Sequence, residues 1–311
     1  MTPAEGSAPI PDSQPRPVPP VEGLAPGNIG AWVQWAVRAL ETASSDARID
    51  AEELMAAQLG LPRSRLSMRF EDSILAADAL RYAGSVERRR VGEPVAYITG
   101  RQGFWSLDLA VNPAVLIPRA DTETLVEWAL QLMRARAGGI AAGALRIADL
   151  GTGSGAIALA LAQELRANAA IVATDQSEAA LAVARQNAQA AGIERVDFRC
   201  GNWFSAFRDG ERFDLIVSNP PYIAERDAHL EALRYEPRVA LTSGVDGLDA
   251  IRHLAGGAFA YLAPQAWLLL EHGHDQGAAV RGLLDEAGFV DVSTRRDFGG
   301  NERISAGRLG S

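Results

Sequence analysis

Cysteine is nearly absent from this sequence: Cys200 is the single one among 311 residues. One cysteine excludes an intramolecular disulfide framework and a cysteine-rich zinc site. No apolar run reaches the roughly 18–20 residues that span a bilayer. The N-terminus also lacks the charged stub and apolar stretch of a secretory signal. These absences predict a cytoplasmic protein that does not bind membranes.

Lysine is absent altogether, so all 30 basic residues are arginine, and 39 acidic residues give a net charge of −9. Broad DNA binding requires basic residues that neutralise phosphates, so we expect no stable binding to nucleic acid. Arg88, Arg89 and Arg90 form the only dense basic cluster. A short charge run of this kind favours a solvated helix end over a contact with a partner.

Composition and spacing divide the chain into regions. Residues 1–27 are rich in proline and poor in large apolar groups, which predicts a disordered tail. Residues 28–91 carry apolar side chains at helical spacing and predict a small all-α domain. Within it, Asp50 and Glu53 resemble a capping box at the start of a second helix, and a third helix is expected from about Asp72.

After residue 91 the spacing of apolar residues changes from three or four to two. Residues 92–118 are predicted to form a hairpin that links two domains, with Ala96–Thr99 as one strand and alternating apolar residues from Trp105 to Val111 as the other. A long helix is expected from Asp121. The remaining residues, 119–311, form the second predicted domain.

Strand-like and helical segments alternate after residue 145, which predicts a parallel sheet covered on both faces. Two final strand-like runs are joined by Gly299-Gly300-Asn301, so the sheet should end in an antiparallel hairpin. The predicted class is α/β, with a seven-stranded, mostly parallel sheet. Its expected strands are Arg146–Leu150, Ala170–Asp175, Val196–Cys200, Phe213–Ser218, Trp267–Glu271, Val290–Phe298 and Glu302–Arg308.

A glycine-rich turn, Gly151-Thr152-Gly153-Ser154-Gly155, follows the first of these strands and precedes a helix. Such a turn lies at the carboxyl edge of an open α/β sheet, where ligands bind, and glycine lets a ligand approach the main chain. Asp175 ends the next strand and can accept hydrogen bonds from both hydroxyls of a ribose. Because Gly151, Gly153 and Ala156 also fit the dinucleotide fingerprint, this turn alone indicates a dehydrogenase or a methyltransferase equally.

The fourth strand runs into Asn219-Pro220-Pro221-Tyr222. Two prolines remove two backbone donors and make the turn rigid. The Asn219 side-chain oxygen and the Pro220 carbonyl can bind the two hydrogens of a planar NH2 group, and Tyr222 can lie against its face. This arrangement selects a primary amide or the exocyclic amine of a base, and it orients the weakly nucleophilic nitrogen toward an electrophile.

With these two motifs the chain resembles the Rossmann-like class I S-adenosylmethionine-dependent methyltransferases that modify planar NH2 groups. Within that class it looks like the bacterial release factor glutamine methyltransferases. The resemblance covers about Val91 to Arg308 and, more loosely, the helical region. Besides the two motifs it is carried by Gly92–Ile98, Leu116–Glu123, Leu268–Gly273 and Asn301-Glu302-Arg303.

The resemblance implies methyl transfer from S-adenosyl-L-methionine, with S-adenosyl-L-homocysteine as product, to the glutamine of the Gly-Gly-Gln loop of class-one peptide chain release factors. It implies that the helical domain recognises this protein substrate, and we expect a monomer. Ala120, Asn202 and Gly300 depart from the family pattern, and Asn202 weakens the adenine-side prediction. The implied cofactor-binding residues are Gly151, Thr152, Gly153, Ser154, Gly155, Asp175, Trp203 and Asn219. The implied substrate-binding residues are Asn219, Pro220, Pro221 and Tyr222, of which Asn219, Pro220 and Tyr222 are the catalytic candidates.

Alternatives stay open at this point. The Asn-Pro-Pro-Tyr turn serves adenine-N6 methylation equally well, and a second relative modifies glutamine on a ribosomal protein. A dehydrogenase and a non-catalytic binding module have less support, because the turn has no role in hydride transfer and every proposed site residue is present.

Several single residues carry two interpretations. Trp203 is expected either to flank an adenine or to pack under a loop. Glu271 is expected either to lie behind the site residues or to lie on the surface. Cys200 is expected to be a buried small hydrophobe, and Arg119 to form a structural salt bridge. His272 and His274 lack a third ligand at suitable spacing, so no metal site is predicted.

Overall fold

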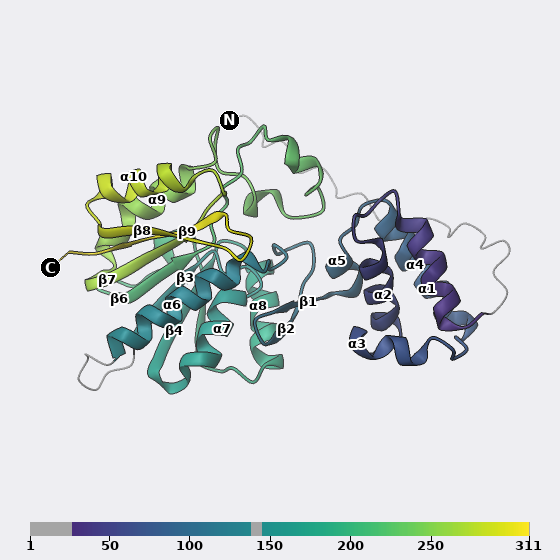
Figure 1. Cartoon of the computed structure of the whole chain (residues 1–311). Helices are drawn as coiled ribbons and strands as arrows, with labels where there is room; N and C mark the ends of the chain where they lie inside the picture. Colours follow the sequence, from purple (N-terminus) through teal and green to yellow (C-terminus); the bar gives the residue numbers. More distant parts are fainter. Residues whose placement is uncertain (1–26, 138–144, 311) are drawn as a thin grey trace, which may run out of the picture. The chain divides into compact units, whose positions relative to one another are not determined.

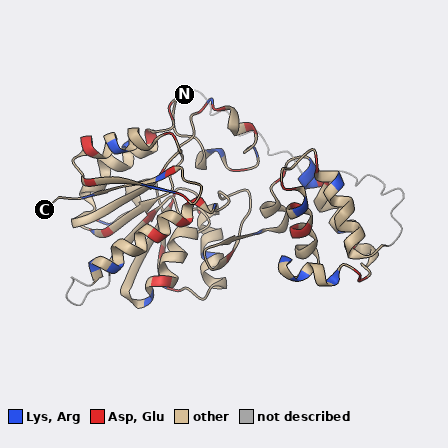
Figure 2. Ribbon diagram, in the orientation of Figure 1, with Lys and Arg blue, Asp and Glu red and all other residues tan. Residues whose placement is uncertain are grey.

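The computed structural model describes residues 27–137 and 145–310, and its chain divides into two units, one ending at Ile98 and the other beginning at Thr99 (Figure 1). This division falls within 92–118, the segment predicted to link two domains. The predicted disordered tail, apart from Gly27, lies outside the described residues. Figure 2 shows acidic and basic residues interspersed along the ribbon of both units.

The N-terminal unit is helical. Asn28 begins it by accepting a hydrogen bond from the Ala31 backbone N–H at 2.9 Å, which caps the first helix. Trp32, Met55 and Tyr82 are buried in its core, where the helices pack on one another. Its helices are α1 (Ile29–Leu40), α2 (Ala47–Gln58), α3 (Arg63–Leu66), α4 (Ala76–Arg90) and α5 (Val95–Thr99).

Two details of this unit differ from the prediction. Asp50 does not cap α2, because the helix begins one turn earlier, and its buried carboxylate instead accepts from the Arg89 Nε at 2.6 Å. The arginine cluster at the end of α4 is therefore not simply solvated: Arg89 pairs with Asp50, and Arg90 pairs with Glu87 at 2.7 Å. In addition, α4 begins at Ala76 rather than near Asp72.

The predicted hairpin is present but uses another strand. Val95–Thr99 is helical, and the strands are β1 (Arg101–Phe104) and β2 (Leu107–Ala110), which pair antiparallel. Proline is tolerated in a first helical turn because its missing N–H has no partner there. The Pro94 carbonyl accepts from Tyr97 and Ile98, so this proline opens a helical turn and not a strand.

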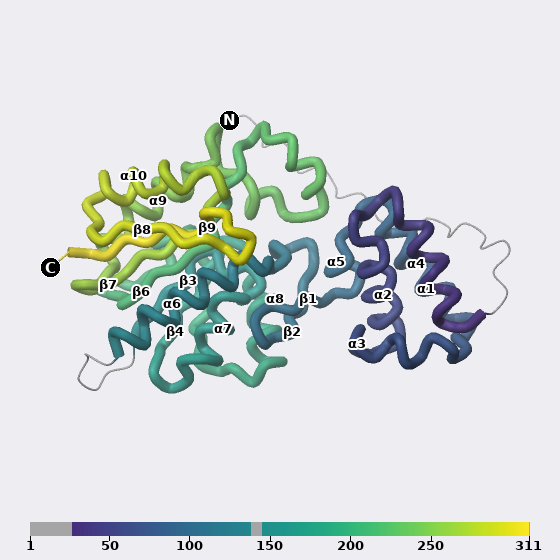
Figure 3. Tube along the Cα trace, viewed as in Figure 1, coloured from purple at the N-terminus to yellow at the C-terminus, as the bar shows by residue number. Residues whose placement is uncertain are grey.

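A seven-stranded sheet forms the second unit, with the order β5-β4-β3-β6-β7-β9-β8. All neighbours are parallel except β9, which lies antiparallel between β7 and β8. Figure 3 shows the C-terminal end of the chain returning to lie beside β7. The predicted α/β class and sheet are thus confirmed. The strands are β3 (Leu145–Leu150), β4 (Ala169–Asp175), β5 (Val196–Cys200), β6 (Phe213–Ser218), β7 (Leu262–Glu271), β8 (Val290–Arg296) and β9 (Glu302–Arg308).

Helices cover both faces of this sheet (Figure 1). Leu145 and Ile147 of β3 pack in the core on the side of α6 (Asp121–Ala137), α7 (Ala156–Leu165) and α8 (Glu178–Ala190). Ala148 and Leu150 pack in the opposite core with α9 (Asp249–Gly257) and α10 (Gly277–Ala287). The buried central strands place the carboxyl ends of β3, β4 and β6 at one edge. Short 3-10 helices lie at Ser67–Arg69, Arg166–Asn168, Trp203–Ala206, Ala228–Glu231, Arg238–Ala240 and Ala258–Ala260.

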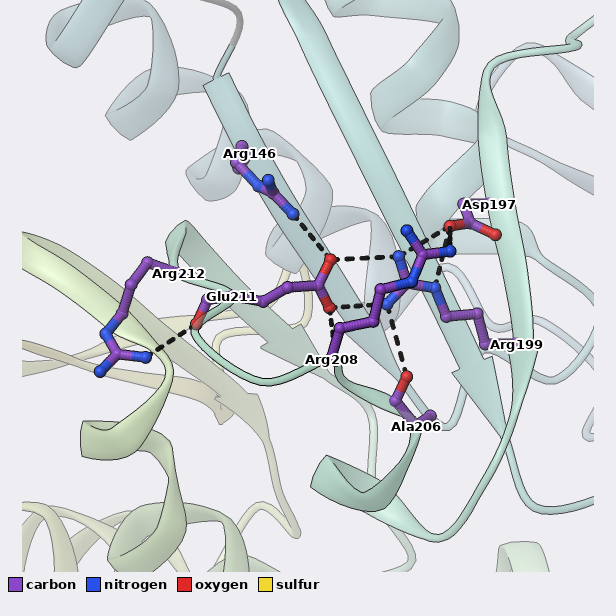
Figure 4. A network of polar contacts seen from close by, with 7 residues as sticks. All are labelled: Arg146, Asp197, Arg199, Ala206, Arg208, Glu211 and Arg212. Atoms are coloured by element: carbon purple, nitrogen blue, oxygen red, sulfur yellow. Dashed lines mark hydrogen bonds and ion pairs between the residues drawn. The ribbon is translucent and has the colours of Figure 1, made fainter.

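An ion network anchors the loop that leads into β6 (Figure 4). Glu211 accepts from the Arg199 Nη1 at 2.6 Å, from the Arg146 Nη2 at 2.9 Å and from the Arg208 backbone N–H at 2.8 Å. These donors, Arg199 first, lower the pKa of Glu211 to about 2. The loop is thereby fixed to β3 and β5.

Candidate active site

The glycine-rich turn connects β3 to α7 through left-handed backbone conformations. Gly151, Gly153 and Gly155 have φ of 74°, 55° and 86°, a region that glycine enters without strain. The backbone N–H groups of Gly151 and Thr152 both donate to the Thr174 carbonyl, at 2.9 and 2.8 Å. The turn is therefore held against the end of β4.

A buried carboxylate forms hydrogen bonds with this turn and with the helix that follows it. Asp149 accepts from the Thr152 hydroxyl at 2.7 Å and from the Ala158 backbone N–H at 3.2 Å, so it connects the turn to α7. Its other oxygen, Oδ1, has no partner among the described residues. Burial raises the pKa of Asp149 to about 7.

Asp175 ends β4 beside the turn. Its Oδ2 accepts from the Gly153 N–H at 3.0 Å and its Oδ1 from the Ser177 N–H at 2.9 Å. Burial raises the pKa of Asp175, while these backbone donors favour its charged form. Each carboxylate oxygen keeps a second lone pair, so Asp175 can still accept two hydroxyl groups.

A cavity of about 300 Å³ opens at this edge of the sheet. Of the predicted cofactor residues, Gly155 does not line it. Gly155 instead precedes α7, where a side chain would come within 3.1 Å of Leu159 and 3.2 Å of Ala184. The predicted residues that do line the cavity are Gly151, Thr152, Gly153, Ser154, Asp175, Trp203, Asn219 and Pro221.

Trp203 forms one wall of the cavity. Its backbone has a φ of 51°, unusual for a large residue, and the ring lies over the turn: a Cβ built on Gly151 would be 3.5 Å from the Trp203 Cζ3. Asn202 lines the cavity beside it. The arrangement presents a flat aromatic surface next to the ribose-binding carboxylate predicted at Asp175.

Asn219 and Pro221 of the Asn-Pro-Pro-Tyr turn line the same cavity as Trp203. The Asn219 Nδ2 donates to the Thr122 hydroxyl at 3.2 Å, while its Oδ1 is buried and without a partner among the described residues. Pro220 is buried, and neither it nor Tyr222 lines the cavity. Tyr222 packs in the core on the α9 side, and its hydroxyl donates to the Glu271 Oε1 at 3.4 Å.

Comparison with known proteins matches both units. Residues 31–100 match the family model described as PrmC N-terminal domain, and residues 142–266 match one described as Methyltransferase domain. A release factor glutamine methyltransferase of Xylella fastidiosa (strain Temecula1) is 54% identical over 84% of this chain and 93% of its own. One of Pseudomonas aeruginosa is 51% identical over 85% of this chain and 94% of its own.

The chain belongs to the release factor glutamine methyltransferase family. It is therefore a methyltransferase, and the dehydrogenase interpretation of the glycine turn is set aside. At the level of fold, the hMettl16 catalytic domain superposes with a TM-score of 0.53, 15% identity and coverage of 78% of this chain and 86% of that one.

This family member completes its cavity with a segment that sequence reasoning missed. Pro237, Val239 and Ala240 line it, as do Ala114–Leu116. Glu236 connects the segment before Pro237 to the segment after Leu116. Its carboxylate accepts hydrogen bonds from the Ile117 backbone N–H and from the Arg119 Nη2, each at 3.1 Å. Arg119 thus forms the structural salt bridge predicted for it. No local motif marks Glu236, which lies more than a hundred residues from its partners.

The structure also gives the burial and the partners of the other residues named in the sequence analysis. Glu271 is buried, not on the surface, and Cys200 is exposed, not buried. His272 is buried between the Gly273 carbonyl at 2.8 Å and the Ser305 hydroxyl at 2.9 Å, whereas His274 is exposed. Within residues 27–137 and 145–310, no cluster of metal-ligating side chains is found. In the same part of the chain, no helix is long and apolar enough to cross a membrane.

Proposed function

We propose that this protein transfers a methyl group from S-adenosyl-L-methionine to the side-chain nitrogen of the glutamine in the Gly-Gly-Gln loop of class-one peptide chain release factors. The observation that carries the proposal is that Asn219 lines the cavity and that its Oδ1 is a buried acceptor with no partner among the described residues. Buried acceptors are normally satisfied, so an NH2 donor is the ligand that this atom lacks. The names of the relatives support glutamine as its source.

The residues around the cavity fit the cofactor. Asp175 would accept hydrogen bonds from the ribose hydroxyls, and Trp203 would flank the adenine. The open main chain at Gly153 would admit the methionine portion, because a Cβ built there would meet no other atom within 4 Å. When bound, S-adenosyl-L-methionine supplies a methyl group on a positively charged sulfur.

The protein's own contribution is to bind and orient the amide. Asn219 Oδ1 would accept one amide hydrogen and the Pro220 carbonyl the other, which draws electron density toward the nitrogen. Rigid prolines keep these acceptors in place, so that little reorganisation accompanies the transfer. Pro221 would form the adjoining wall of the glutamine pocket. Tyr222 would complete that pocket after a change of side-chain position, since its hydroxyl is now directed at Glu271.

The N-terminal unit would recognise the release factor. Residues 31–100 match a PrmC N-terminal domain model separate from the methyltransferase model, which supports a role that a methyltransferase fold does not supply by itself. We also propose that the enzyme acts in the cytoplasm as a monomer and forms no stable complex with nucleic acid. The acidic composition supports the last point.

Mass spectrometry of unmethylated release factor after incubation with enzyme and S-adenosyl-L-methionine tests the proposal. We expect one added methyl group on the glutamine of the Gly-Gly-Gln loop. Asn219→Ala should abolish it, whereas Asn168→Ala, which removes an exposed asparagine far along the chain, should not. No methyl on the factor, together with methylated adenine in a parallel nucleic-acid reaction, would replace this function by adenine methylation.

A further inference from the structure

Two segments that lie far apart in the sequence line the cavity together with the predicted cofactor residues. The first wall consists of residues 114–116 and 118, shortly before α6. The second wall consists of Pro237, Val239 and Ala240, in the loop between β6 and α9. Glu236 does not itself line the cavity. It directly precedes the second wall, however, and its hydrogen bonds reach the first.

Each wall contains a hydrogen-bonded turn. In the first, the Val115 backbone N–H donates to the Asn112 carbonyl at 3.1 Å; in the second, the Ala240 N–H donates to the Pro237 carbonyl at 2.9 Å. Pro118 and Pro237 also have a fixed φ. We therefore expect each wall to move as a unit. A contact that connects the two units determines where one lies relative to the other.

The connection requires a carboxylate. The Ile117 backbone N–H donates to the Glu236 Oε2, and the Arg119 Nη2 donates to the Oε1, each at 3.1 Å. Both partners are donors, and a carboxylate accepts with both of its oxygens. A glutamine would keep one acceptor and turn an NH2 group toward the other donor. The Glu236 side chain is 6% exposed, so little water is available to replace a lost partner.

We infer that Glu236 is a positioning residue for the cofactor: by holding Ile117 and Arg119 it keeps the two walls in the arrangement that binds S-adenosyl-L-methionine. The inference rests on the proposed function for the identity of the cofactor. The measured affinity of a ligand falls in proportion to the fraction of the protein that is in the binding-competent arrangement. Weakening the connection therefore lowers cofactor affinity without removing an atom that lines the cavity.

Direct attraction between charges is the competing explanation. Glu236 is negative and the sulfur of S-adenosyl-L-methionine is positive, so loss of the charge would by itself weaken binding. S-adenosyl-L-homocysteine separates the two explanations, because it has the same adenosine and amino acid groups but a neutral sulfur. Positioning of the walls affects both ligands equally. Direct attraction affects the charged ligand alone.

Three variants and one control make the comparison. Glu236→Gln keeps the shape and removes one acceptor, Glu236→Asp keeps the charge and shortens the reach, and Arg119→Gln leaves the Ile117 contact in place. Glu231→Gln is the matched control, because Glu231 lies in the same loop, is 85% exposed and pairs with Arg234 at 3.7 Å. Calorimetry with each ligand gives the Kd values, and thermal melts show whether each variant is folded.

In Glu236→Gln and Glu236→Asp we expect the Kd for both ligands to rise about tenfold, the effect of a lost hydrogen bond to a charged group. In Arg119→Gln the rise should be about threefold, since a partly exposed ion pair contributes less. Glu231→Gln should match the wild type. The double variant Glu236→Gln/Arg119→Gln should bind no more weakly than Glu236→Gln, because the connection is already lost. At saturating cofactor, kcat should stay within about twofold of the wild type.

Unchanged Kd values in Glu236→Gln, or weaker binding of S-adenosyl-L-methionine alone, would overturn the inference. If the Glu236 variants do not fold, Arg119→Gln provides the same comparison: equal weakening of both ligands supports the inference, and no weakening overturns it. The binding measurements need no release factor. The expected Kd changes together with a factor that the wild type leaves unmethylated would overturn the proposed function and uphold the role of Glu236.

Discussion

Replacing Glu271 with glutamine should make this protein more stable in mild alkali. Burial raises the pKa of Glu271 from its ordinary 4.5 to about 7, with Thr122, Arg303 and Arg119 opposing the rise. The folded state therefore binds a proton more tightly than the unfolded chain does. Stability from this group is present below pH 4.5 and is lost as pH rises through about 7.

The magnitude follows from the two pKa values. A tenfold change in proton affinity corresponds to about 1.4 kcal/mol, so the difference between 4.5 and about 7 corresponds to about 3 kcal/mol at pH 8. Glutamine has nearly the same shape and no charge to desolvate. The free energy of unfolding of Glu271→Gln minus that of the wild type should therefore rise by about 2 to 3 kcal/mol from pH 5 to pH 8.

Urea unfolding at four pH values between 5 and 8 measures this difference. Subtraction removes the contribution of Asp149, whose pKa is also raised to about 7 but which both proteins contain. A difference that stays flat with pH would show that Glu271 ionises near its ordinary pKa. One that falls with pH would show that the folded state favours the carboxylate; either result refutes the reasoning.

Three further predictions concern other parts of the second unit. Gly247→Ala should lower kcat at least tenfold, because the new Cβ would lie 2.3 Å from the Tyr222 carbonyl and displace the Asn-Pro-Pro-Tyr turn, as steady-state kinetics would show. Trp203→Ala should weaken S-adenosyl-L-methionine binding by about 1 to 3 kcal/mol, measured by calorimetry, since base stacking on an aromatic ring contributes that much. Glu211→Gln should remove the stabilisation by Arg199, which is present above pH 4.5 and is lost as pH falls through about 2. In thermal melts, the difference in Tm between variant and wild type should therefore be smaller at pH 3 than at pH 7.

Much of the fold could be predicted because its signals are local. Strand and helix periods fixed the order of elements in the second unit, and the glycines at the final hairpin indicated the antiparallel end. Errors occurred where two local signals competed. Val95–Thr99 has strand-forming residues, yet Pro94 opens a helical turn there. Asp50 has capping-box spacing, yet it lies within α2, where its carboxylate pairs with Arg89.

The site divides in the same way. Asn219 and Asp175 could be found because each sits in a short motif at a strand end, where parallel strands bring side chains to one edge. Thr122 and Glu236 could not, because their roles depend on contacts across roughly a hundred residues of chain. Exposure was also beyond reach: neither the buried state of Glu271 nor the exposed state of Cys200 follows from its neighbours in sequence.

The two buried carboxylates near this edge of the sheet lower the stability of the fold at neutral pH, while each accepts a hydrogen bond there. Asp149 accepts a hydrogen bond from Thr152 of the glycine turn, and Glu271 accepts one from the Tyr222 hydroxyl. Each has a pKa of about 7, so at neutral pH each destabilises the fold in its charged form. A neutral side chain would relieve that cost but would no longer act only as an acceptor. The fold thus keeps two buried acceptors, one beside the glycine turn and one beside Tyr222, at the expense of stability.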